Sequence, residues 1–134
     1  MVQLSKKVEY SLIALRQMAM KPKGHVFTAK ELATYDALPY DLLAKVLQKL
    51  TRAGIVTSQQ GSHGGYALLR HPEELTIAEV IRAIDDSKPM VAECYMAGKE
   101  RCTLIDNCTI RGPLEKLQHN LDGLFDNTTL QEII

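Results

Sequence analysis

Apolar side chains recur along this chain at helical spacing, and polar or glycine-rich stretches separate the apolar runs. In the first run, Val8, Leu12, Leu15 and Ala19 follow one another at steps of four, three and four residues. Such a stripe predicts a helix with one buried face. The same reasoning predicts helices over residues 5–20, 29–34, 39–53, 77–84 and 113–127, and a tail of helical spacing over 129–134.

Local signals mark where several of these helices begin and end. The segments 28–31 and 76–79 have capping-box sequences, in which a threonine hydroxyl and a glutamate carboxylate satisfy backbone N–H groups reciprocally. Pro39 fits the first position of its helix, and Gly54 is expected to follow that helix in a left-handed conformation. The two helices on either side of residues 35–38 are joined by a tight link, which is typical of a helix-turn-helix.

A β-hairpin is predicted directly after the helix-turn-helix. Short β-type runs at 55–58 and 66–69 flank the glycine-rich segment 59–65. A hairpin in this position is a wing. The expected fold is therefore mainly α with a small β-hairpin wing, organised as a winged helix-turn-helix, a cysteine-containing loop and a long C-terminal dimerisation helix with a short tail, over residues 1–86, 87–112 and 113–134.

Charge is distributed unevenly, although the 134-residue chain has a formal net charge of zero. Residues 1–70 contain ten Lys and Arg against four Asp and Glu, a net of +6, and residues 71–134 contain six against twelve, a net of −6. This asymmetry indicates that the first half meets a polyanion, or else that the two halves attract each other within the fold or across a dimer.

We favour DNA as the polyanion, because the basic excess coincides with the winged helix-turn-helix. The alternative is a winged fold used only for protein contacts, with solvated surface lysines. A recognition helix enters the major groove, and a wing tip contacts phosphate or the minor groove. The predicted DNA-contacting residues on the helix and the wing are Tyr40, Asp41, Lys45, Gln48, Lys49, Arg52, Gln59, Gln60, Ser62 and His63.

The three cysteines of the chain, Cys94, Cys102 and Cys108, lie within one loop. Their spacing is not that of a zinc knuckle, and His119 on the following helix lies about 16 Å beyond the last cysteine, too far for the same ion. Three thiolates on a loop suit an iron–sulfur cluster, which tolerates a different ligand at one iron. The alternative from spacing alone is three partly buried structural thiols.

A leucine seam marks the last long helix. Leu114, Leu117, Leu121 and Leu124 recur at steps of three, four and three, and Phe125 lies beside them. The seam covers under two heptads. It is therefore compatible with a dimer interface and with ordinary intrachain core.

From residue 4 to residue 134 the chain resembles the IscR/NsrR family of winged-helix transcription regulators. The resemblance rests on the opening helix, the recognition segment, the wing, the closing segment and the triple-cysteine loop before the last long helix, at residues 7–12, 38–43, 61–66, 129–133 and 94–108. It implies a homodimeric regulator, with repression the favoured role, that carries a 2Fe–2S or 4Fe–4S cluster on Cys94, Cys102 and Cys108 and packs its last helix against the partner subunit. Control of operator binding by redox state, nitric oxide or cluster supply is then expected.

The chain departs from the family's pattern at two positions. Where one branch has a histidine ligand after the last cysteine, this chain has Arg111, which cannot bind iron. In the nitric-oxide-sensing branch an acidic residue on the partner's first helix fills that role, and Glu9 occupies its position here. Glu9 is thus the expected fourth ligand, or alternatively an exposed glutamate in a surface ion pair. In the wing, Gln60 replaces the arginine that many members have, which weakens minor-groove reading.

Other function classes have little support in the sequence. The chain has no phosphate-binding glycine loop, catalytic triad or metallohydrolase motif, so neither an enzyme nor a small-molecule substrate is expected. No apolar run reaches about 18 residues and no signal peptide precedes the first helix, so a cytoplasmic protein without membrane contact is expected. The remaining rivals are a cluster-free regulator in which two thiols pair on oxidation and, from another class, a small electron-transfer protein.

Overall fold

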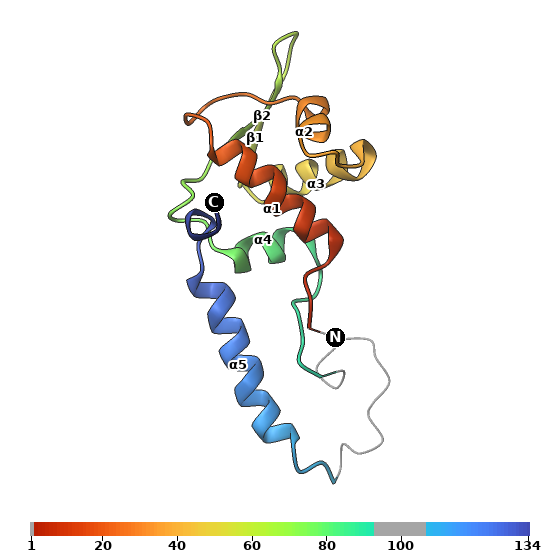
Figure 1. Cartoon of the computed structure of the whole chain (residues 1–134), viewed down its shortest axis with the longest axis vertical. Helices are drawn as coiled ribbons and strands as arrows, with labels where there is room; N and C mark the ends of the chain where they lie inside the picture. The colour runs from red at the N-terminus through yellow and green to blue at the C-terminus, as the bar shows by residue number, and fades with distance from the viewer. Residues whose placement is uncertain (1, 93–106) are drawn as a thin grey trace.

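The computed structural model describes residues 2–92 and 107–134, and Figure 1 shows a head from which one long helix extends. Helices α1, α2, α3 and α4 and the hairpin β1–β2 form the head, and α5 leads back to it through the short 3₁₀ helix η2 (Figure 1). In chain order the elements are α1 (Lys6–Ala19), α2 (Ala29–Tyr35), α3 (Tyr40–Arg52), β1 (Val56–Gln59), β2 (Gly65–Leu68), α4 (Ile77–Ile84), α5 (Arg111–Asn127) and η2 (Leu130–Ile133). The predicted fold class, a mainly helical chain with a hairpin wing, is confirmed.

Both predicted capping boxes are present. The Thr28 hydroxyl accepts a hydrogen bond from the Glu31 N–H at 3.0 Å, and the Glu31 carboxylate accepts one from the Thr28 N–H at 3.3 Å. Thr76 and Glu79 repeat this exchange at the start of α4, at 3.2 Å in both directions. The N-terminal N–H groups of these two short helices are thereby satisfied, so each helix begins at a defined residue.

Several predicted boundaries differ from the structure by one or two residues. Pro39 lies before α3 as its N-cap, with an extended ψ of 120°, rather than in the first helical position. The strands pair from Val56 with Leu68 to Gln59 with Gly65, one residue later and one residue earlier than predicted. The last helix begins at Arg111 rather than at Pro113, because a proline is tolerated throughout the first turn, where N–H groups have no helical partner.

The core lies where α1, α3 and α4 meet. Its largest fully buried side chains include Leu15, Leu43, Leu47 and Leu130. The apolar stripe predicted for α3 faces this core, with Leu42 half-buried at its edge. Leu130 comes from η2, so the C-terminal segment is part of the head and not a free tail.

The C-terminal end of α5 is fastened to the head by backbone hydrogen bonds. The Leu130 N–H donates to the Leu75 carbonyl at 2.8 Å, and the Ile77 N–H donates to the Thr128 carbonyl at 2.9 Å. The N-terminal end of α5 points away from the head (Figure 1). Among the helices in the described ranges, none combines the length and the hydropathy that a membrane span requires.

Candidate nucleic-acid interface and cysteine segment

The end of α3 is fixed by a Schellman motif around Gly54. Gly54 has a φ of +75°, and its N–H donates to the Thr51 carbonyl at 3.1 Å, while the Ile55 N–H donates to the Leu50 carbonyl at 3.0 Å. Leu50 and Ile55 are both buried, as this motif favours. The predicted left-handed cap is therefore present, and it sets the angle at which the chain leaves α3 for the wing.

The solvent face of α3 carries most of the residues predicted to contact DNA. Asp41, Lys45, Gln48 and Arg52 are exposed, and their spacing of four, three and four residues places them on one side of the helix. Tyr40, at the first turn, is 53% exposed. This face offers two cations, hydrogen-bonding groups and an aromatic ring to a groove.

Lys49 has a different contact from the one predicted. Its ammonium donates a hydrogen bond to the Ile84 carbonyl at 2.9 Å, and the residue is half-buried. Ile84 is the last residue of α4, where carbonyl groups lack helical donors and a cation is favoured by the helix dipole. Lys49 therefore joins the predicted recognition helix to α4 inside the head.

The wing projects from the head beyond β1 and β2 (Figure 1). At its base Phe27 and Tyr66 exchange backbone hydrogen bonds at 2.8 and 2.7 Å. A β-carbon at Gly65 would lie 2.3 Å from the Phe27 carbonyl oxygen, so only glycine permits this approach. The predicted tip residues Gln59, Gln60, Ser62 and His63 are all exposed.

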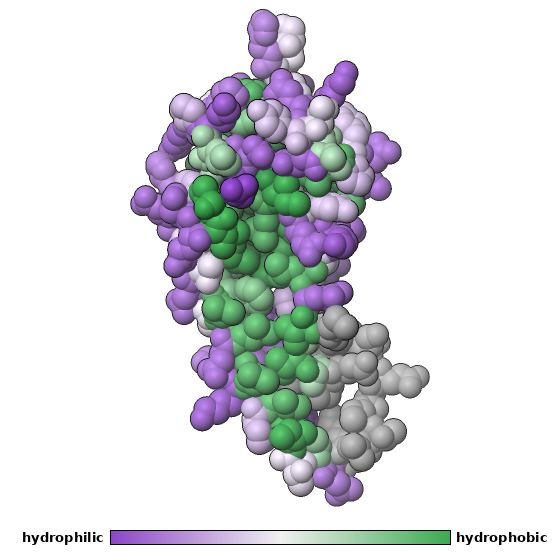
Figure 2. Space-filling view, viewed as in Figure 1, coloured by the Kyte–Doolittle hydropathy of each residue, from purple (hydrophilic) through white to green (hydrophobic). Residues whose placement is uncertain are grey.

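The leucine seam of α5 faces mainly outward. Leu117 and Leu124 are 52% and 59% exposed, and Leu114 and Leu121 are half-buried. Figure 2 shows hydrophobic surface gathered in a band along α5. Phe125 was predicted to belong to this dimerisation surface, but it packs against the core of its own chain. One residue past Leu124 turns a side chain about 100° around a helix, which accounts for the difference.

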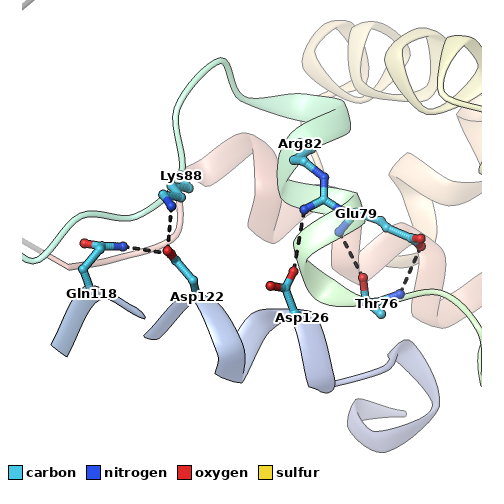
Figure 3. Close-up of polar contacts among 7 residues, drawn as sticks. All are labelled: Thr76, Glu79, Arg82, Lys88, Gln118, Asp122 and Asp126. Carbon is cyan, nitrogen blue, oxygen red and sulfur yellow. Dashed lines mark hydrogen bonds and ion pairs between the residues drawn. The ribbon is translucent and has the colours of Figure 1, made fainter. Parts of the chain in front are cut away.

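The inward face of α5 carries a buried polar residue that the sequence analysis missed. Gln118, 7% exposed, accepts a hydrogen bond from the Val91 N–H at 2.8 Å and donates to the Pro89 carbonyl at 3.1 Å and to Asp122 at 2.9 Å. The other oxygen of Asp122 meets the Lys88 ammonium at 2.6 Å (Figure 3). A lone glutamine beside a leucine seam gives no sequence signal of such contacts.

Opposing effects act on the pKa of Asp122, and the net result is a lowered pKa. Partial burial raises the pKa, but hydrogen bonds from Lys88 and Gln118 and the nearby positive charge of Lys88 lower it more. One turn further along α5, Asp126 pairs with Arg82 of α4 at 3.6 Å (Figure 3). These contacts hold α4, residues 88–91 and α5 together.

Of the predicted iron ligands, Cys94 and Cys102 lie outside the described residues. Cys108 is a free, half-buried thiol three residues before α5. Glu9 lies in the first turn of α1, 43% exposed, and pairs with Lys6 at 2.9 Å. Within the described ranges no three histidine, cysteine or acidic side chains converge on one point. The donor set of the sequence, three thiols and a carboxylate, is one that iron–sulfur clusters accept.

Comparisons with known proteins agree on the class of this chain. The family model Rrf2, described as iron-dependent transcriptional regulator, matches residues 4–134. The regulator NsrR of Bacillus licheniformis is 32% identical over 133 residues, which cover 99% of this chain and 92% of that protein. Among solved structures, a transcriptional regulator from Listeria innocua has a TM-score of 0.81 at 24% identity, covering 98% of this chain and 85% of the other. CymR, the global cysteine regulator of B. subtilis, has a TM-score of 0.75 at 23% identity, covering 99% and 96%.

Proposed function

Because the chain belongs to the Rrf2 family of iron-dependent transcriptional regulators, we propose that it is a homodimer whose operator affinity is set by an iron–sulfur cluster. The family places the chain among DNA-binding transcription regulators, which are not enzymes. The observation that carries the proposal is that one family match spans the winged head, the three cysteines and α5. Repression is the simplest role for such a protein, since a dimer on an operator blocks access to it.

In this proposal α3 enters the major groove with its exposed face. Lys45 and Arg52 neutralise phosphates, while Tyr40, Asp41 and Gln48 lie toward base edges. Gln59, Gln60, Ser62 and His63 at the wing tip meet the adjoining backbone or minor groove. Lys49 is left out of this set, because its ammonium already bonds to Ile84.

Dimerisation through α5 gives the protein two such heads. The outward leucines leave apolar surface uncovered, and burial of one leucine contributes about 1.5–3 kcal/mol. A two-fold dimer presents two recognition helices, which engage half-sites about one or more helical turns apart. A small change in the angle between the subunits then alters whether both heads dock at once.

The thiolates of Cys94, Cys102 and Cys108 are proposed to hold the cluster, with Glu9 of the partner subunit as the fourth ligand. Glu9 lies on α1, which packs against α3 and α4 in the head. When bound, a cluster supplies bonds that oxidation, nitric oxide or iron loss breaks. Ligation by Glu9 requires it to leave Lys6, and an exposed pair of this kind contributes little to stability.

The test is to purify the protein without air and to compare its cluster-loaded and iron-free forms on operator DNA at one salt concentration. We expect iron and acid-labile sulfide in the purified protein, and at least tenfold different affinities of the two forms. Equal affinities would refute the proposed switch. Cys108→Ser is expected to lose iron while retaining the helical content of the parent protein.

A cluster-free thiol switch is the second candidate, and it is supported by the structural likeness to the cysteine regulator CymR, whose oxidized form is known from Staphylococcus aureus. In that case the protein contains no iron or sulfide, and oxidation joins two of the three cysteines. The same purification separates the two candidates. A colourless protein whose operator affinity changes only on oxidation is a thiol switch.

A further inference from the structure

The side chain of Gln118 fits the backbone that enters the cysteine segment. A carboxamide offers one acceptor oxygen and two N–H donors. Here the oxygen takes the Val91 N–H, one donor reaches the Pro89 carbonyl and the amide nitrogen also reaches Asp122. All three bonds are 3.1 Å or shorter, and the residue is almost fully buried. Leaving such groups unpaired in a buried site is costly, so the glutamine fixes the path of residues 89–91.

Lys88 and Asp122 complete this arrangement. We call residues 88–91 the stem, and Lys88, Gln118 and Asp122 the stem clasp. Lys88 reaches Asp122 at 2.6 Å, and the carboxylate also accepts from Gln118 (Figure 3). The clasp therefore holds two side chains of α5 against residues 88–91. Cys94 follows Val91 by three residues in the sequence, and Cys108 precedes α5 by three. The residues on both sides of the cysteine segment are thus attached to α5, residues 88–91 through the clasp and Cys108 through the chain itself.

The stem is also connected to the recognition helix α3, through the end of α4. Lys49 of α3 bonds to the carbonyl of Ile84, and Lys88 follows Ile84 by four positions in the sequence. Four residues span at most about 14 Å when fully extended. The stem therefore cannot move further than this from the end of α4 without displacing it, and Lys49 joins that end of α4 to α3.

We propose that Gln118 is a positioning residue, through which a change at the three thiols alters the placement of α3. The inference rests on the proposed function, because it assumes that operator binding responds to the state of the cysteines. It adds a residue that binds neither DNA nor iron and lies outside the outward leucine seam. Its role is to keep the stem on α5 in one state and to release it in the other.

The experiment compares the parent protein with Gln118→Leu, which removes the bonds to residues 89–91, and with Gln118→Glu, which removes the donor. Glu115→Leu is the matched control, because Glu115 is exposed on the same helix. Each protein is purified without air, checked for helical content, dimer and iron, and assayed on operator DNA in its loaded and iron-free forms. Amide hydrogen exchange at Val91 reports the clasp itself.

We expect the amide of Val91 to exchange about fivefold faster in Gln118→Leu, since a bond of this kind contributes about 1 kcal/mol. The affinity ratio of the two forms should fall to within about twofold of one, and Glu115→Leu should keep both parent values. A merely structural role lowers stability without moving the ratio. If both Gln118 variants keep the parent ratio, or Val91 stays protected, the inference is wrong. If the loaded and iron-free forms of the parent protein bind the operator equally, the proposed function and the coupling are both refuted. If the parent forms differ in affinity and Gln118→Leu retains that difference, the coupling alone is refuted.

Discussion

The ammonium of Lys49 donates a hydrogen bond to the carbonyl oxygen of Ile84 at 2.9 Å, which links the recognition helix to the end of α4. Four residues away on the exposed side of α3, Lys45 has its side chain in solvent. Two lysines of one helix thus have separable roles, one inside the head and one toward the proposed DNA.

Replacement of Lys49 by methionine should destabilise the head. A charged hydrogen bond to a backbone carbonyl contributes about 1.5–3 kcal/mol, and we expect a loss of about 1–2 kcal/mol in urea unfolding at fixed protein concentration. Lys45→Met is the matched control, with stability within about 0.5 kcal/mol of the parent protein. Lys45→Met should instead weaken operator binding and reduce the salt slope by about one. A stable Lys49→Met with a reduced salt slope would contradict this division of roles.

Most of the fold could be predicted from the sequence, because the signals are local. The helical stripes, both capping boxes and the cap at Gly54 depend on residues within a few positions of each other. The contact of Lys49 with Ile84 spans 35 residues, and that of Gln118 with Val91 spans 27. Such contacts follow from the packing of α3, α4 and α5 and leave no periodic signal.

The candidate site could be predicted from the sequence less completely than the fold. The exposed face of α3 and the wing tip followed from helix phase and hairpin position, so those residues lie where they were expected. Phe125 packs against the core of its own chain, which the sequence does not reveal, because a phenylalanine beside a leucine seam fits either face of the helix. Cys94, Cys102 and a fourth ligand from a partner subunit stay predictions.

The low pKa of Asp122 makes the stability of the clasp pH-dependent. Since its pKa in the folded protein lies below the ordinary value of 3.8, the ionised carboxylate stabilises the fold above that value, and this stability is lost as the pH falls through the folded pKa. Asp122→Asn should lower the unfolding free energy by less than about 1 kcal/mol at neutral pH, as a partly exposed pair allows. The difference from the parent protein should shrink below pH 3.8.

Asp126→Asn is the control for this measurement. Its pair with Arg82 is longer, at 3.6 Å, and both side chains are more exposed. We expect a stability change below about 0.5 kcal/mol. A difference between Asp122→Asn and the parent protein that persists unchanged into acid would mean that the carboxylate charge contributes nothing.

A charge on the outward face of α5 should separate the subunits. In a two-fold interface Leu117→Asp removes two leucines, each worth about 1.5–3 kcal/mol, so the dimer dissociation constant should rise at least about 100-fold. Sedimentation velocity would show a monomer, and operator affinity would fall with it. His119→Asp, on the opposite side of the helix, should stay dimeric. A dimeric Leu117→Asp would place the interface elsewhere.

Glu9 has been interpreted as a cluster ligand or as half of a surface ion pair. The two interpretations can be separated, because Lys6 is its partner in that pair. If Glu9 is a ligand, Glu9→Ala should lose iron to a chelator about tenfold faster or more, whereas Lys6→Ala should retain iron like the parent protein. Both variants should keep the unfolding transition of the parent protein, since an exposed ion pair contributes little to stability. Equal iron loss from the two variants would mean that Glu9 acts only through its ion pair.

The wing tip offers a test by gain of affinity. Gln60 is exposed at the end of the hairpin, so an arginine there costs no buried contact. If the tip meets phosphate or a narrow minor groove, Gln60→Arg should tighten operator binding about five- to tenfold and raise the salt slope by about one, because one more phosphate is neutralised. Gln131→Arg adds the same charge on η2, at the other side of the head, and should leave the salt slope unchanged (Figure 1). Equal effects of the two arginines would mean that added charge acts at long range and that the wing does not touch DNA.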